Sequence, residues 1–492
     1  MKMTRLSARE VLTGFGGLLA ISASLALAAW IFAVFTRWWT GVQNSDLDLA
    51  SYSTPTPEPA GNFFSSLGFD FNNPVNGNYR ARMVMDLPLQ PQLKGQIDRS
   101  SPEAVPWPFD PVLAHAVDLD ATAKTIRQLA ESGITNSTVD GSAYQRNLLE
   151  AKTSRELCSL FLQPVRPYLQ DIYASLPKPK SIYPAPSLLQ ANLDTPTLKL
   201  YDLLGIFKFL ALDQLLDFGS PGHNRSAKPL RAALRIAEGL FQRPVGLFAV
   251  LGGTTICSLS LPLLWQGVEG GHFSDATTLD LLRELERLNP MQNIKEVTGQ
   301  ESSWNFHVIE WMAWREPWWK RVFLIPITQI WQGFFILHWA EIQRELEGEA
   351  GFKKHPSLPR PGFWNAYAVL YPKHAIDLYN EACHLNILLQ LALQDLALDL
   401  FIRKNGQAPE SLEALVPSIL PSLPKDPFSG NNFGYRKTSA TKYIIYSCWV
   451  DAKDDSGTPV TIPQPPPKDL LPFLRNQAKG DLVWPQHHAG KN

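Results

Sequence analysis

The hydrophobic positions between residues 111 and 403 recur with the spacing of an α-helix. Leucine, alanine and phenylalanine return every third or fourth residue from Leu200 to Leu215 and again from Leu230 to Phe241. This period places them on one helix face, so both stretches predict amphipathic helices. A longer pattern from Pro372 to Arg403 predicts one long helix, and Asn405-Gly406 is a strong C-terminal stop for it. The bulk of the chain is therefore predicted to be helical.

Two further stretches extend the helical prediction. Ser274 is a predicted N-cap for a helix that carries regularly spaced leucines and ends at Asn289-Pro290. Val245–Gln266 is apolar enough to span a membrane, but it contains Gly252-Gly253 and Pro262. We favour a buried central helix over a membrane span for this stretch.

Tryptophan is abundant, with 15 in the chain, and many of these lie between Trp304 and Trp339. We favour a Trp-rich core for this region. The alternative is a patch at a membrane surface, formed by Trp311, Trp314, Trp318 and Trp319 beside Lys320 and Arg321. The apolar stretch 322–340 that follows is predicted to be a packed helix or one that lies on a membrane.

The N-terminal region predicts a membrane anchor. Residues 11–35 carry no charged side chain, and at a rise of about 1.5 Å per residue they exceed a hydrocarbon core of about 30 Å. Lys2, Arg5 and Arg9 precede this run, which keeps the N-terminus in the cytoplasm. We expect a single-pass protein of the bacterial inner membrane with its bulk in the periplasm. The alternative is a signal peptide cleaved after Ala28.

Composition limits the classes of partner and divides the chain. The 45 Lys and Arg are balanced by 46 Asp and Glu, so we expect no nucleic-acid partner. Many of the 40 prolines fall in connecting stretches, and the region from residue 43 to residue 111 is rich in Pro and Gly. The predicted parts are a cytoplasmic tip and anchor (1–40), a Pro-rich linker and wrapping segment (41–111), an all-α domain (112–371) and a long helix with an α+β module (372–492).

Few side chains form a recognisable reactive motif. The four cysteines are widely spaced without a C-x-x-C pair, and three lie in apolar helical patterns, so buried free thiols are favoured over disulfides. No P-loop, H-E-x-x-H or G-x-S-x-G sequence occurs. Glu381-x-x-His384 has the spacing of a di-iron ligand pair, but no second copy accompanies it, so a structural pair is favoured.

An acidic loop is the candidate metal site. Asp451, Asp454 and Asp455 follow a predicted strand at Tyr443–Trp449 and precede Gly457. Several carboxylates in a short loop suit a hard cation such as Ca²⁺. The alternative is an exposed acidic turn.

The chain from about Leu391 onward resembles the C-terminal half of the major pseudopilins of type II secretion. Their pattern P-x-S-L-E-x-L-V-P-x-x-L-P-x-L-P-x-D-P is matched from Pro409 to Pro427. Their pattern Y-x-x-Y-S-x-G-x-D is matched from Tyr443 to Asp451 except at the glycine position. Gly480–Trp484 is similar to the family's closing strand. The chain differs from the family in three respects. The family tends to have glycine where Trp449 stands, and it lacks the roughly 350 residues that precede the module here. The family also has a leader-processing site that this N-terminus does not match.

The resemblance implies a fold and a metal. It implies a short antiparallel sheet packed on a long helix, and calcium in the loop that contains Asp451, Asp454 and Asp455. Residues 243–288 also resemble membrane-anchored proteins of planctomycete- and verrucomicrobia-type bacteria, which pair a Leu-rich helical domain with such a tail.

These features predict a mainly α, non-enzymatic envelope protein. We expect it to act as a scaffold or to bind a protein partner in the cell envelope, in association with type II secretion-like machinery. The alternatives are an envelope hydrolase with an unrecognised site and a protein that binds lipid or another hydrophobic ligand.

Overall fold

The computed structural model describes about half of the chain. The described residues are Trp30, 119–131, 141–179, 181, 200–218, 227–242, 247–294, 297, 316–321, 324–325, 328, 366–449, 452–459 and 480–484. The predicted anchor at 11–35, apart from Trp30, and the predicted linker at 41–111 lie outside these residues.

The described part is mostly helical with one small antiparallel sheet, which confirms the mainly α fold class with a small α+β part. The chain falls into two compact units. The first contains residues 1–56, 186–195 and 295–377, and the second contains 57–185, 196–294 and 378–492. The predicted domain boundaries at 40, 111 and 371 stay predictions, although one continuous helix runs through the last of them.

The described part of the second unit begins with four short helices: α3 (Leu119–Glu131), α4 (Gly141–Glu150), α5 (Ser154–Leu162) and α6 (Arg166–Ala174). The Thr153 hydroxyl caps α5 by accepting a hydrogen bond from the Glu156 N–H at 3.1 Å. In return, the Glu156 carboxylate accepts the Lys152 N–H at 2.9 Å, so orphan donors at this helix start are satisfied.

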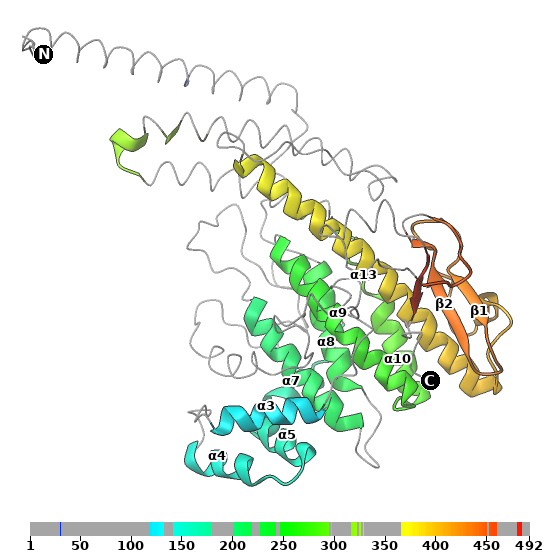
Figure 1. Cartoon of the computed structure of the whole chain (residues 1–492), viewed down its shortest axis with the longest axis horizontal. Helices are drawn as coiled ribbons and strands as arrows, with labels where there is room; N and C mark the ends of the chain where they lie inside the picture. The colour runs from blue at the N-terminus through cyan, green and yellow to red at the C-terminus, as the bar shows by residue number, and fades with distance from the viewer. Residues whose placement is uncertain are drawn as a thin grey trace, which may run out of the picture. The chain divides into compact units, whose positions relative to one another are not determined.

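Four longer helices follow: α7 (Leu200–Phe218), α8 (Lys228–Gln242), α9 (Leu247–Glu269) and α10 (Asp275–Glu286). They confirm the helices predicted from the apolar periods. Ser274 is the N-cap of α10, and its side chain accepts the Thr277 N–H at 3.2 Å. Figure 1 shows α8 and α9 side by side in this bundle.

Helix α9 is buried, as predicted for Val245–Gln266. A Cβ atom on Gly253 would lie only 2.7 Å from Cε1 of Phe241, so the glycine is needed for the close approach of α8 and α9. By length and composition, Ala249–Glu269 and Glu381–Asn405 could each cross a membrane, but 72% of each window is buried inside the protein. Burial against other helices explains their apolar composition, and we treat both as core helices.

Helix α13 (Ala366–Asn405) is 40 residues long and begins six residues before the predicted start, so Pro372 lies in its second turn. It ends as predicted: Gly406 has φ 77° and its N–H donates to the Ile402 carbonyl at 2.7 Å. Arg403 joins this end to α10, because its guanidinium contacts Asp275 at 2.6 Å and the Thr278 hydroxyl at 2.6 Å.

After α13 come a 3₁₀ turn (Leu412–Leu415) and the strands β1 (Gly434–Lys437), β2 (Tyr443–Ser447) and β3 (Leu482–Trp484). All neighbours are antiparallel in the order β1-β2-β3. The register pairs Tyr435 with Ile445, and Ile445 with Trp484. The sheet lies along the C-terminal part of α13 (Figure 1), which confirms the predicted strand at Tyr443 and the closing strand.

Two other predictions have clear outcomes. The core interpretation is wrong for Trp318 and Trp319, which are 76% and 54% exposed. The remaining tryptophans between Trp304 and Trp339 lie outside the described residues.

The cysteines are free thiols, and all of them except Cys383 are buried, as their apolar patterns predict.

Candidate functional site

The predicted calcium loop connects β2 to the segment before β3. Asp451 lies outside the described residues, whereas Asp454 and Asp455 are exposed in the loop. One carboxylate oxygen of Asp454 accepts the Tyr446 hydroxyl at 2.8 Å and the Ser456 N–H at 2.8 Å. Asp454 therefore ties the loop back onto the sheet.

A third carboxylate, Asp481, faces the same loop from the start of β3 and was missed from the sequence. It is fully buried and accepts the Gly457 N–H at 2.7 Å and the Asp455 N–H at 3.4 Å. Burial raises the pKa of Asp481 to about 6, the two backbone N–H groups oppose that shift, and the nearby charges of Asp454 and Asp455 add to it.

The fit of this loop to a metal depends on Asp451. Within the described ranges, no three His, Cys, Asp or Glu side chains come together as a metal-binding group. Both oxygens of Asp481 already accept backbone hydrogen bonds, and one oxygen of Asp454 accepts two hydrogen bonds. The described residues alone therefore do not form a calcium cage, and calcium at Asp451, Asp454 and Asp455 stays a prediction.

A second buried carboxylate, Asp426, joins the Pro-rich turn to the end of β2. Its Oδ2 accepts the Ser447 hydroxyl at 3.0 Å and the Cys448 N–H at 2.9 Å, and its Oδ1 accepts the Phe428 N–H at 3.0 Å. These charge-assisted bonds use both carboxylate oxygens. Asp426 therefore fixes the turn.

The junction between α13 and the sheet is centred on Asp395. The Tyr443 hydroxyl donates to its carboxylate at 2.6 Å. Burial raises the pKa of Asp395 to about 6, and the hydrogen bond from Tyr443 partly opposes this shift. The Tyr443 pKa rises well above its ordinary value because of its own burial and the neighbouring carboxylate. One polar contact thus joins the helix to β2.

Aromatic rings surround this junction. The Tyr435 ring stacks with Tyr443 at a centroid distance of 6.2 Å, and its hydroxyl donates to the Pro409 carbonyl at 2.7 Å. The His384 ring lies 5.0 Å from the Trp449 ring. His384, from the Glu381-x-x-His384 pair, is therefore part of the packing between α13 and the residues after β2.

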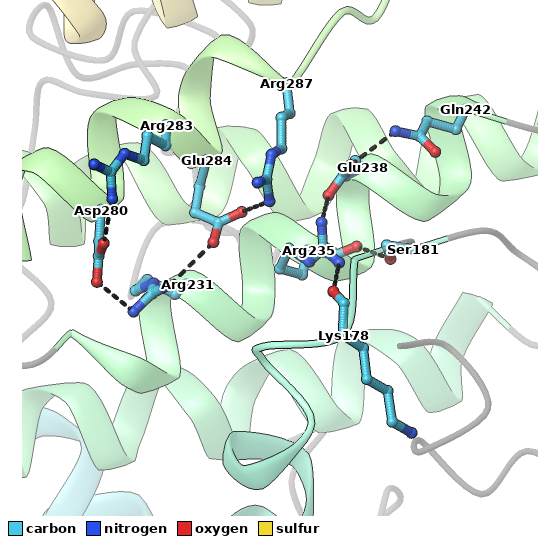
Figure 2. Close-up of polar contacts among 10 residues, drawn as sticks. All are labelled: Lys178, Ser181, Arg231, Arg235, Glu238, Gln242, Asp280, Arg283, Glu284 and Arg287. Carbon is cyan, nitrogen blue, oxygen red and sulfur yellow. Dashed lines mark hydrogen bonds and ion pairs between the residues drawn. The ribbon is translucent and has the colours of Figure 1, made fainter. Parts of the chain in front are cut away.

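A network of charged residues joins α8 to α10 (Figure 2). Arg231 contacts Asp280 at 2.7 Å and Glu284 at 3.3 Å. Glu284 also contacts Arg287 at 3.2 Å, and Asp280 contacts Arg283 at 3.3 Å. The two contacts of Arg231 join α8 to α10, whereas the pairs Asp280–Arg283 and Glu284–Arg287 lie three residues apart along α10 and support that helix.

Arg235 is the fully buried member of this region, with 0% of its side chain exposed. It forms an ion pair with Glu238 at 2.5 Å and donates to the Lys178 carbonyl at 2.6 Å (Figure 2). The Ser181 hydroxyl donates to the Arg235 carbonyl, and Gln242 donates to Glu238 at 2.7 Å. Burial raises the pKa of Glu238, and the Arg235 guanidinium opposes part of that shift. The pair fixes the segment after α6 against α8.

Sequence reasoning did not single out Asp395, Asp481, Arg235 or Glu238. Each of these charged residues lies within an apolar stretch of the sequence. An example is Leu230–Phe241 in α8, where nearly every position is buried. Charged residues are almost never fully buried unless they are paired, so such a position predicts a partner without naming it.

Comparison of the chain with protein-family models, curated proteins and solved structures gave no match.

Proposed function

We propose that this protein is a non-enzymatic, membrane-anchored envelope protein that acts as a scaffold and binds a protein partner through its C-terminal module. The module comprises the C-terminal part of α13 and the residues that follow it. The finer proposal, association with type II secretion-like machinery, rests on the resemblance to major pseudopilins.

The observation that carries the proposal is the attachment of the sheet to α13. Tyr443, the first residue of β2, donates a hydrogen bond to Asp395 of the helix. A buried polar contact of this kind requires a defined position of sheet against helix, because an unpaired buried carboxylate is costly. The C-terminal part of α13 and the sheet therefore form one element that can present a surface.

Backbone geometry supports the pseudopilin-like character of the module. Trp449 has φ 50°, in the left-handed region that favours glycine. Pseudopilins tend to have glycine at the corresponding position after this strand. Trp449 thus adopts a backbone conformation that glycine adopts more easily, at a position where the family tends to have glycine.

The partner-facing surface that we propose is the outer edge of β1. Within the described residues no strand pairs with that edge, whereas β2 is paired on both sides. Arg436 is exposed on β1, and Lys437 forms an ion pair with Glu410 at 2.7 Å. Unpaired backbone groups of an edge strand can accept a partner strand or a flexible segment.

Two measurements on the full chain test this proposal. Membranes are extracted with alkaline carbonate, and a photo-crosslinking amino acid is placed at Arg436 or, as control, at the exposed Lys124 of α3. We expect the protein to stay in the membrane and to crosslink to an envelope protein from position 436 only. Release by carbonate contradicts the anchor. Equal crosslinking from both positions contradicts the β1 surface, and a crosslinked partner outside secretion machinery contradicts the finer proposal.

A further inference from the structure

Trp318 and Trp319 form an exposed aromatic pair at the start of the helical residues 318–321. The turn begins after Glu316-Pro317, and the Pro317 carbonyl accepts the N–H groups of Lys320 at 2.9 Å and Arg321 at 3.1 Å. The backbone of this corner is therefore ordered, while its two largest side chains are left facing outward.

Cationic side chains adjoin the pair. Lys320 Nζ contacts the Glu316 carboxylate at 2.7 Å and lies 5.5 Å from the centre of the Trp319 ring. Arg321 Nε donates to the Glu316 backbone carbonyl at 2.6 Å. Residues 316–321 therefore contain one carboxylate and two cationic side chains.

Exposed large apolar side chains of the described residues are concentrated in one unit. Trp30, Trp318 and Trp319 belong to the unit formed by residues 1–56, 186–195 and 295–377, whereas Leu149 of the other unit is 38% exposed. Large exposed apolar side chains beside polar ones mark a contact surface.

The sequence of that unit points to lipid as the contact. Residues 11–35 and 322–340 are both free of Asp, Glu, Lys and Arg, and the second run begins directly after Arg321. Trp is enriched where a membrane protein passes from hydrocarbon to water, and Lys and Arg near that level interact with anionic lipid headgroups. The order Trp-Trp-Lys-Arg followed by an uncharged run fits that transition.

We propose that the Trp318–Arg321 corner is a second membrane contact, with both indoles in the headgroup layer and Lys320 and Arg321 facing anionic lipid phosphates. This inference rests on the proposed membrane location and adds a site besides residues 11–35. The indole rings bury their apolar faces among the lipids while their N–H groups stay hydrated or hydrogen-bonded.

The test uses the full chain labelled with 5-fluorotryptophan in nanodiscs of phosphatidylcholine and phosphatidylglycerol. Trp318→Phe and Trp319→Phe assign the two ¹⁹F resonances. We expect both to lose intensity when a lipid carrying a nitroxide near its headgroup is included. The resonance of the buried Trp484 serves as the reference, and Leu149→Trp supplies a matched exposed tryptophan in the other unit that we expect to respond only to a soluble gadolinium chelate.

Other results overturn the inference. Loss of intensity with the chelate but not with the nitroxide lipid places the pair in water, and protection from both places it under protein, such as a second copy. An equal loss of ¹⁹F intensity at position 149 of the Leu149→Trp variant would mean that the lipid contact is not specific to Trp318 and Trp319. We expect Lys320→Gln with Arg321→Gln to lessen the loss, and an unchanged loss rules out the role of the cations. Failure of the proposed function can be distinguished from failure of this inference. If the proposed membrane anchor were wrong, alkaline carbonate would release the chain from membranes.

Discussion

The Tyr443 hydroxyl donates a hydrogen bond of 2.6 Å to the Asp395 carboxylate, although 48 residues separate the two in sequence. This contact connects the first residue of β2 to the C-terminal third of α13. Removing this hydrogen bond is therefore the most direct test of whether the sheet and the helix behave as one element.

Tyr443→Phe removes the hydroxyl that donates to Asp395, so the buried carboxylate loses this hydrogen bond. We expect the free energy of local opening of β2 to fall by about 1–3 kcal/mol. Hydrogen exchange of the Ile445 and Tyr446 amides measures it. Tyr144→Phe is the matched control, since that buried hydroxyl donates to the Phe161 carbonyl at 3.0 Å, far from the sheet in sequence. Equal effects of both variants on β2 would contradict a local role for Tyr443.

The same carboxyl makes the junction sensitive to pH. Because the folded pKa of Asp395 is about 6 and an unfolded Asp has a pKa of about 3.9, the folded state binds the extra proton between these values. The contribution of Asp395 to stability is therefore largest below about pH 4, falls by about 1–3 kcal/mol as the pH rises to about 6, and is constant above.

Hydrogen exchange of β2 across that pH range, corrected for the intrinsic exchange rate, measures this dependence. We expect Asp395→Asn to remove it while keeping an acceptor for Tyr443. A difference between the native chain and Asp395→Asn that does not change with pH would mean that Asp395 does not titrate in this window.

The buried pair Arg235–Glu238 should be far more important for stability than the exposed contacts of the same network. Glu238→Leu leaves the Arg235 guanidinium buried without its partner, so we expect a loss of about 3–5 kcal/mol. Arg283→Ala should cost less than about 1 kcal/mol, since that side chain is 68% exposed. Hydrogen exchange of α8 amides measures both. Adding Arg235→Met to Glu238→Leu should restore part of the loss, and no recovery would mean that cavity formation dominates.

The calcium prediction is tested by native mass spectrometry of the full chain in detergent, with and without EDTA. We expect a mass decrease of one Ca²⁺ on adding EDTA, and no bound calcium in Asp451→Ala. Asp171→Ala, which changes an exposed carboxylate of α6, should retain the ion. A mass that EDTA leaves unchanged would remove the metal from this loop and leave Asp454 as a hydrogen-bonding residue of the turn.

The sequence by itself determined the local elements. The apolar periods predicted α7 and α8, Ser274 predicted the start of α10, and Asn405-Gly406 predicted the end of α13. These features depend on residues three or four apart or on one glycine, so they are visible without knowledge of the fold.

Only the tertiary structure decided which charged groups meet and which apolar groups stay outside. The apolar period predicts that a helix has a buried face. It does not predict that Asp395 accepts a hydrogen bond from Tyr443, or that Asp481 accepts one from the Gly457 N–H. Nor does it distinguish a buried Trp from the exposed Trp318. Burial depends on the packing of elements that are distant in sequence, and a buried charge is tolerated only where that packing supplies its partner.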